Sequence, residues 1–179
     1  MCSVLFIVGL FTGCPTPSEW DQQWQQVQQA LQADRLEEAK ELLEDILPSL
    51  QNNGSTDKRY GEAIFQLAEI ARREEKFDQA ESYYWKALPL IAESRGPEHI
   101  RMADPLTELA TLYQHKEQPS VALPLLKRAL AIREKSWGLS NKELLPTLKH
   151  YHLLLMLNDR HEEAVGILTR ISHLEHPSS

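Results

Sequence analysis

The segment 106-LTELATLYQHKEQPSVALPLLKRALAIREK-135 decides the fold of this chain. Its first part carries apolar side chains at i, i+3, i+4 and i+7, from Leu106 to Tyr113, a spacing typical of one face of an α-helix. Its second part shows helical spacing again from Ala122 to Leu130. We therefore expect two helices joined by a short polar turn, which together make a helical hairpin.

This hairpin recurs along the chain. Ala80 and Ala164 lie 42 residues before and after Ala122, and Ala39 lies 41 residues before Ala80. Each alanine is followed by apolar residues four and seven positions later. A small residue is needed where the two helices of a hairpin cross closely, and larger residues then fill the groove between neighbours. The repeat predicts an all-α fold of about four hairpins.

The expected elements follow from this period. We expect helices at about 20–33, 36–51, 57–74, 77–94, 101–116, 119–136, 141–157 and 161–173. Gly96 and Gly138 are expected to stop helices. The repeats then span about 20–56, 57–96, 101–138 and 141–173, forming one array over 20–173, followed by a tail at 174–179.

The amino-acid sequence of the third repeat resembles a known family. The stretches Gly96–Ala103, Leu106–Tyr113 and Ala122–Lys135, closed by Trp137-Gly138, resemble tetratricopeptide repeats (TPR) of the 42-residue subtype found in kinesin light chains. The resemblance implies an α-solenoid with a right-handed superhelix and a protein-binding scaffold role. It names no partner.

The first helices of stacked hairpins line the concave face of such an array. A protein or peptide partner is expected in this groove, as an amphipathic helix or an extended segment. Its expected lining is Trp24, Gln28, Phe65, Glu69, Arg72, Thr107, Thr111, Gln114, Lys149, Leu153 and Met156. The alternative is that some of these residues serve hairpin packing. The two-asparagine clamp that holds a C-terminal carboxylate in related repeats would need Asn at Glu69 and Thr111, so such a ligand is disfavoured.

The first residues suggest a second function. An apolar stretch of about eight residues, Val4 to Phe11, matches the core of a secretory signal. Leu10-Phe11-Thr12-Gly13-Cys14 resembles a bacterial lipobox, which implies a signal peptide over 1–14, lipidation of Cys14 with palmitate among its acyl groups, and a tether over 15–19. Because Met1-Cys2-Ser3 carries no basic residue, the alternative is an apolar start that packs on the first repeat or is disordered.

Composition excludes other functions. A net charge of -7 disfavours nucleic acid as a partner, since phosphate binding needs a basic face. The chain carries no Gly-x-Ser-x-Gly, His-Glu-x-x-His or Walker motif, so we expect no enzyme and no cofactor. His150 and His152 lie on different sides of one helix, and His173 and His176 lack further ligands, so we expect no metal site.

The last repeat has unusual apolar positions. The run Leu153–Leu157 is apolar all round its helix, which predicts burial on more than one side. We expect Val165, Leu168 and Ile171 to be partly exposed. This end is therefore expected to dock on a partner or on another copy of the chain, giving a homo-oligomer through the C-terminal repeat.

Together these observations predict a non-catalytic TPR adaptor, a membrane-tethered lipoprotein that serves assembly of a cell-envelope complex. Its expected location is the bacterial cell envelope, lipid-anchored and facing the periplasm, with the outer membrane slightly favoured. The alternative is a soluble cytoplasmic TPR adaptor with an apolar start that is not a signal.

Overall fold

The computed structural model describes residues 17–52 and 57–176, so the predicted signal peptide and Cys14 lie outside the described residues. Within these two ranges the structure has eight α-helices, two short 3₁₀ helices and no β-strand. The all-α fold class predicted from the sequence is confirmed.

The elements follow one another as pairs of helices. In chain order they are α1 (Pro17–Gln32), α2 (Leu36–Asn52), α3 (Lys58–Arg73), α4 (Phe77–Arg95), η1 (Ile100–Met102), α5 (Ala103–His115), α6 (Pro119–Trp137), η2 (Lys142–Leu144), α7 (Leu145–Leu157) and α8 (His161–Glu175).

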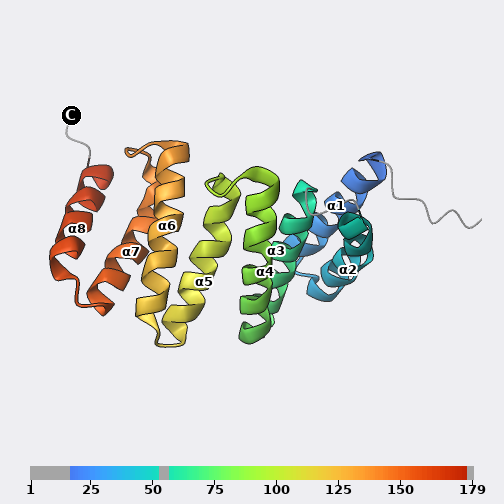
Figure 1. The fold of residues 1–179 in the computed structure, drawn as a ribbon, viewed down its shortest axis with the longest axis horizontal. Helices are drawn as coiled ribbons and strands as arrows, with labels where there is room; N and C mark the ends of the chain where they lie inside the picture. Colours follow the sequence, from blue (N-terminus) through green and yellow to red (C-terminus); the bar gives the residue numbers. More distant parts are fainter. Residues whose placement is uncertain (1–16, 53–56, 177–179) are drawn as a thin grey trace, which may run out of the picture. The chain divides into compact units, whose positions relative to one another are not determined.

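The chain forms two compact units that meet in sequence between Ser49 and Leu50. The described part of the first unit holds α1 and most of α2. The second unit holds the hairpins α3–α4, α5–α6 and α7–α8, which lie side by side in chain order (Figure 1).

The backbone repeats as the sequence does. The turn inside each hairpin contains one non-glycine residue with φ between 56° and 60°, and these residues are Asp34, Glu75, Glu117 and Asp159. The N–H of the next residue donates to the carbonyl five positions earlier, at 2.8 to 2.9 Å in all four turns. This bonding satisfies carbonyls at the end of the first helix. The four predicted hairpins are therefore present.

The crossing alanines behave as predicted. Ala39, Ala80, Ala122 and Ala164 are all fully buried. The sequence reading missed Gly61, where a Cβ would lie 2.8 Å from Ile91 Cγ1 and 3.0 Å from the Ile91 nitrogen. Helices α3 and α4 thus approach each other more closely than alanine would allow.

The expected glycine stops are also confirmed. Gly96 and Gly138 cap α4 and α6 with φ values of 103° and 84°. A 3₁₀ turn then precedes α5 and α7, where the side chains of His99 and Asn141 accept backbone N–H bonds.

Two predicted boundaries need correction. Helix α1 begins at Pro17, so the last residues of the predicted tether are helical. Proline is favoured at the first helical position because the N–H there has no acceptor within the helix, so a residue without that N–H loses no hydrogen bond. Helix α8 continues to Glu175, into the predicted tail, and Leu174 is buried.

Pro48 and Pro89 lie inside the second helices α2 and α4 without ending them. Both are exposed, and α2 and α4 continue for four and six residues beyond them. The carbonyl that such a proline leaves unpaired lies on the same exposed side of the helix. Among the described helices none is long and apolar enough to cross a bilayer.

Candidate binding face

The first helices of the second unit, α3, α5 and α7, carry nine of the predicted groove residues on what we call the first-helix face. The other two, Trp24 and Gln28, lie on α1 in the first unit, where both are half-buried.

At α3, the structure brings three predicted residues into one network. The Tyr84 hydroxyl on α4 donates to Glu69, and Arg72 Nη2 donates to the same carboxylate at 3.0 Å. Arg72 Nε forms an ion pair with Glu108 of α5 at 3.3 Å. The Phe65 ring centroid lies 5.9 Å from that of Tyr84. These polar groups therefore bind one another across three helices.

Electrostatics within this network follow from its partial burial. Desolvation raises the pKa of Glu108, the nearby Glu69 charge raises it further, and Arg72 lowers it. The hydrogen bond to Glu69 raises the pKa of Arg72, so its guanidinium is charged at any physiological pH. Burial likewise raises the pKa of Tyr84, which keeps its hydroxyl a proton donor.

In the middle hairpin, Thr107 is engaged by Arg133 of α6. The Arg133 guanidinium donates to the Thr107 hydroxyl at 3.0 Å and to the Thr147 hydroxyl at 2.6 Å. It also donates to Asp104 at 2.9 Å. Arg133 thereby ties α5, α6 and α7 together, and Thr107 serves packing within its own hairpin.

Three further predicted polar residues are also paired. Thr111 donates to the Thr107 carbonyl at 3.0 Å. A Gln114 side-chain oxygen lies 2.7 Å from His150 Nε2, across the α5–α7 boundary. Lys149 pairs with Glu175 of α8 at 2.7 Å. Burial lowers the pKa of His150, and the neighbouring His115 lowers it further, so this imidazole is neutral at pH 7.

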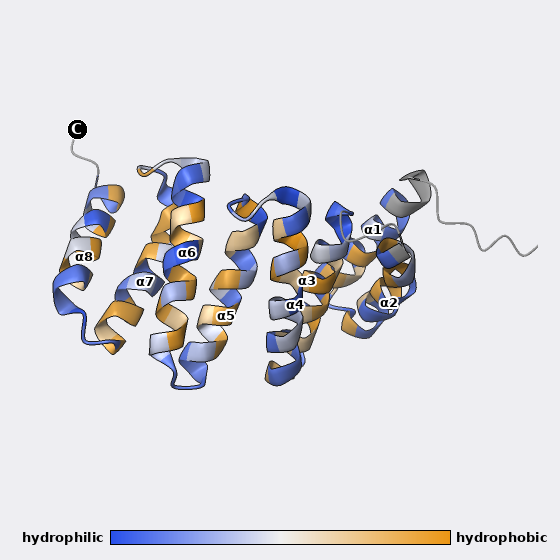
Figure 2. Cartoon of the chain, viewed as in Figure 1, coloured by the Kyte–Doolittle hydropathy of each residue, from blue (hydrophilic) through white to orange (hydrophobic). Residues whose placement is uncertain are grey.

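The remaining predicted residues, Leu153 and Met156, are the apolar part of the face. Their side chains are 44% and 43% exposed, and Leu157 beside them is 49% exposed. The spacing i, i+3, i+4 places the three on one side of α7, and we call them the α7 patch. Figure 2 shows apolar colouring along this C-terminal part of α7.

Burial along this apolar run differs from the prediction. Leu154 and Leu155 are fully buried, but the three patch residues are not, so an all-apolar helix is covered on one side only. Downstream, Val165 and Leu168 are exposed as predicted, whereas Ile171 is buried. Ile171 lies 42 residues after the buried Ala129, on the inner side of its hairpin.

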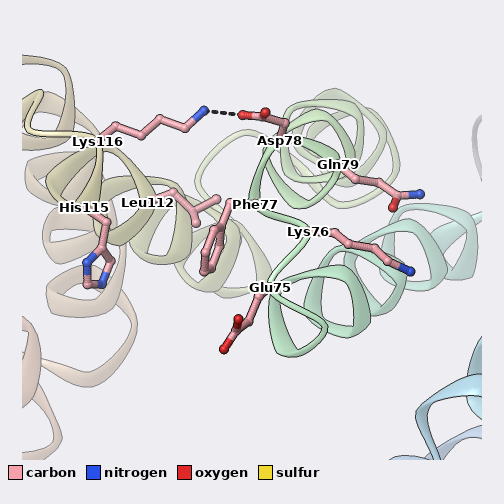
Figure 3. Close-up of a pocket in the computed structure, with 8 residues that line it drawn as sticks. All are labelled: Glu75, Lys76, Phe77, Asp78, Gln79, Leu112, His115 and Lys116. Atoms are coloured by element: carbon pink, nitrogen blue, oxygen red, sulfur yellow. Dashed lines mark hydrogen bonds and ion pairs between the residues drawn. The ribbon is translucent and has the colours of Figure 1, made fainter.

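A pocket of about 580 Å³ lies where the α3–α4 turn meets the end of α5. Phe77 and Leu112 form its apolar part and lie next to each other in Figure 3. Lys116 at its rim pairs with Asp78 at 2.8 Å and with Glu81 at 2.6 Å. Sequence reasoning missed this pocket because it depends on a turn of one repeat meeting a helix end of the next.

The first-helix face lacks the residues of a carboxylate clamp. At the two positions that would need asparagines for a carboxylate clamp lie Glu69 and Thr111, and the Glu69 charge repels a carboxylate. No three His, Cys, Asp or Glu side chains within the described ranges could hold a metal ion together.

Comparison with known proteins agrees with this geometry. Residues 59–135, from α3 to near the end of α6, match the family model for the tetratricopeptide repeat. These residues, fewer than half of the chain, are therefore similar to tetratricopeptide repeats.

Solved structures with the same fold include a kinesin-light-chain-type protein of Podosopora anserina with nearly identical TPR-like repeats. It has a TM-score of 0.67 and 20% identity over 90% of this chain and 77% of that chain. BtubC (BKLC) from P. vanneervenii has a TM-score of 0.72 and 23% identity over 86% of this chain and 64% of that chain. At these sequence identities the similarity shows a shared fold and no shared function.

Among curated proteins, the clustered mitochondria protein homolog of Eremothecium gossypii is 26% identical over 121 residues, which is 64% of this chain. The chain spans about 10% of that relative's length. The match therefore concerns a repeat segment of a much larger protein.

Proposed function

We propose that this chain is a non-catalytic adaptor that binds a segment of a protein partner on the first-helix face, with apolar side chains of the partner on the α7 patch. One observation supports this proposal most. The polar residues Glu69, Arg72 and Lys149 are already paired within the chain, whereas the α7 patch is exposed.

Physical reasons favour the patch as the anchor point. Burying an exposed apolar side chain stabilises a complex by about 25 cal/mol per Å². A partner that bound the polar residues would have to displace existing hydrogen bonds. Interfaces usually depend on a few buried anchors, with the surrounding contacts nearly neutral.

A photo-crosslinking residue at position 156, in place of Met156, should capture the partner in cells. The same residue in place of the exposed Lys127 on α6 is the control. The binding segment of the captured protein is then titrated against the full chain. We expect Leu153→Glu or Leu157→Glu to weaken its affinity at least about ten-fold, since a charge would be buried in the interface. Equal affinity in all variants would place the binding site elsewhere.

We further propose that the adaptor is held at the bacterial envelope by acylation of Cys14, facing the periplasm, where it serves assembly of an envelope complex. The lipobox-like residues before Cys14 support this proposal. The α3–α8 hairpins use no cysteine, because both cysteines of the chain lie in its first 14 residues.

Membrane fractionation with a clickable palmitate analogue tests the anchor. Wild type and Cys2→Ala should label and sediment with membranes, and Cys14→Ala should do neither. If wild type and Cys14→Ala are equally soluble and unlabelled, the chain is the soluble cytoplasmic adaptor of the alternative reading.

A further inference from the structure

Helix α8 carries an unpartnered stripe on its outer side. Glu162, Val165, Leu168 and Ser172 follow one another at helical spacing, and we call them the α8 stripe. Val165 is 63% exposed and Leu168 is 52% exposed. Val165 and Leu168 thus form a small apolar patch on one side of α8.

The other hairpins show what covers these positions. Leu123 and Leu126 of α6 lie 42 residues before Val165 and Leu168, and they are 5% and 0% exposed. Helix α7 packs against α6, as α5 packs against α4, and Tyr84 of α4, 42 residues before Leu126, is fully buried. The stripe thus repeats a surface that binds the first helix of the next hairpin.

The covering helix also makes a polar contact at its end. Lys116, directly after α5, pairs with Asp78 and Glu81 at the start of α4, at 2.8 and 2.6 Å. Asn158, directly after α7, donates to the Pro119 carbonyl at the start of α6, at 3.0 Å. In both cases the end of the covering helix binds the start of the helix beneath it.

The matching position on α8 is acidic. Glu162 lies 84 residues after Asp78, is exposed, and makes no ion pair with the described residues. It is thus placed to receive a cation from a covering helix, as Asp78 receives Lys116.

We propose that the α8 stripe docks an amphipathic helix of a protein partner in the arrangement that α5 has on α4. The apolar side of that helix covers Val165 and Leu168, and a basic residue at its C-terminal end pairs with Glu162. This surface is distinct from the first-helix face, so the proposal goes beyond the adaptor function above.

Charge favours such a partner over a second copy of α8. The two arginines on or next to α8 are already paired, Arg160 with Glu163 and Arg170 with Glu134. If two α8 stripes faced each other, each Glu162 would therefore meet no free lysine or arginine from the other copy.

The test uses the helix that already fills the equivalent surface. The probe is a synthetic peptide of residues 100–117, cross-linked between positions 107 and 111 to hold it helical, and titrated by fluorescence anisotropy against the full chain. We expect binding that Leu168→Glu weakens by about ten-fold or more. Glu162→Lys should weaken it by roughly three-fold, as a surface ion pair would. The peptide variant K116E should restore binding to Glu162→Lys to within about two-fold of the original pair.

Val121→Glu on α6 is the matched control, since Val121 is also an exposed apolar residue. It should bind the peptide as wild type does, and circular dichroism should show that all variants keep their helices. Absence of binding to wild type at millimolar peptide, or equal loss in Leu168→Glu and Val121→Glu, would overturn the proposal. So would a wild-type dimer in sedimentation that Leu168→Glu dissociates, because a second copy would then occupy the stripe.

Discussion

At the scale of single residues, the environment of each polar side chain decides its role. Glu69, Arg72 and Thr107 have the residue types expected of a peptide-binding groove, but each one bonds to a neighbouring helix. The free apolar residues Leu153 and Met156 are therefore better candidates for binding energy. Their exposure follows from the lack of a described element above them.

The left-handed turn residues allow a direct test. Glu117 has φ 57°, a conformation that costs a non-glycine residue about 1–3 kcal/mol. Glycine adopts it freely but loses about 0.4–1 kcal/mol through its more flexible unfolded state. Glu117→Gly should therefore stabilise the protein by about 1 kcal/mol, measured by urea denaturation. Gln118→Gly is the control, since Gln118 has φ -115° and should gain nothing.

Two glutamates should respond to pH with opposite signs. Burial raises the pKa of Glu108 above its unfolded value, so the folded state binds this proton more tightly, and the stability gained is lost as the pH rises above about 4.5. Glu108→Gln cannot ionise. Its free energy of unfolding should therefore increase relative to wild type between about pH 4.5 and pH 7.

Glu81 provides the opposite case. Hydrogen bonds from Lys116 and Tyr113 lower its pKa, so its contribution to stability is present above the unfolded pKa and is lost on acidification. Glu81→Gln should therefore lose stability relative to wild type as the pH rises toward about 4.5 from below, and the difference should then stay constant up to pH 7. Urea titrations at four pH values measure both slopes, and slopes of equal sign would contradict the assignment.

At the scale of elements, helix crossing sets which small residues the fold requires. The four alanines at the hairpin crossings were recognisable because they recur in the sequence. Gly61 was not, since its position is occupied by Ala103 and Leu145 in the later repeats. Only the closeness of α3 to α4 shows why glycine is needed at that point.

Two glycines therefore make a matched pair of substitutions. Gly61→Ala should destabilise the protein by about 1–3 kcal/mol, because the new Cβ would lie 2.8 Å from Ile91 Cγ1. Gly166→Ala should stabilise it by about 0.5–1 kcal/mol, because nothing lies within 4 Å and alanine is the better helix former. Thermal and urea unfolding measure both changes. Destabilisation by both would mean that helix packing around Gly166 differs from that described.

At the scale of the whole molecule, the three hairpins of the second unit share a continuous core. Tyr84, Leu109 and Leu126 are fully buried along it, and Arg133 and Gln114 add bonds between hairpins. In such arrays stability is close to a sum of terms within repeats and between neighbours. The second unit therefore has the features of an independently folding segment.

We expect the fragment 53–179 to fold without α1 and α2. It should show a helical circular dichroism spectrum and one cooperative urea transition, with a smaller m-value than the full chain because less surface is exposed on unfolding. The matching fragment 17–52, a single hairpin, should be largely unfolded, since a lone repeat cannot bury its apolar face. A non-cooperative transition for 53–179 would show that the first hairpin is required for its core.

The sequence by itself determined the helices, the four hairpins and the fold class. These depend on local spacing, on turn residues and on an apolar pattern that repeats every 41 or 42 residues. Tertiary structure alone decided which side chains are paired within the protein and which are exposed to solvent. It paired Arg72 with Glu108 and Thr107 with Arg133, and left the α7 patch and the α8 stripe exposed. The physical reason is that hydrogen bonding and burial depend on residues from other helices, whose approach no single periodic pattern specifies.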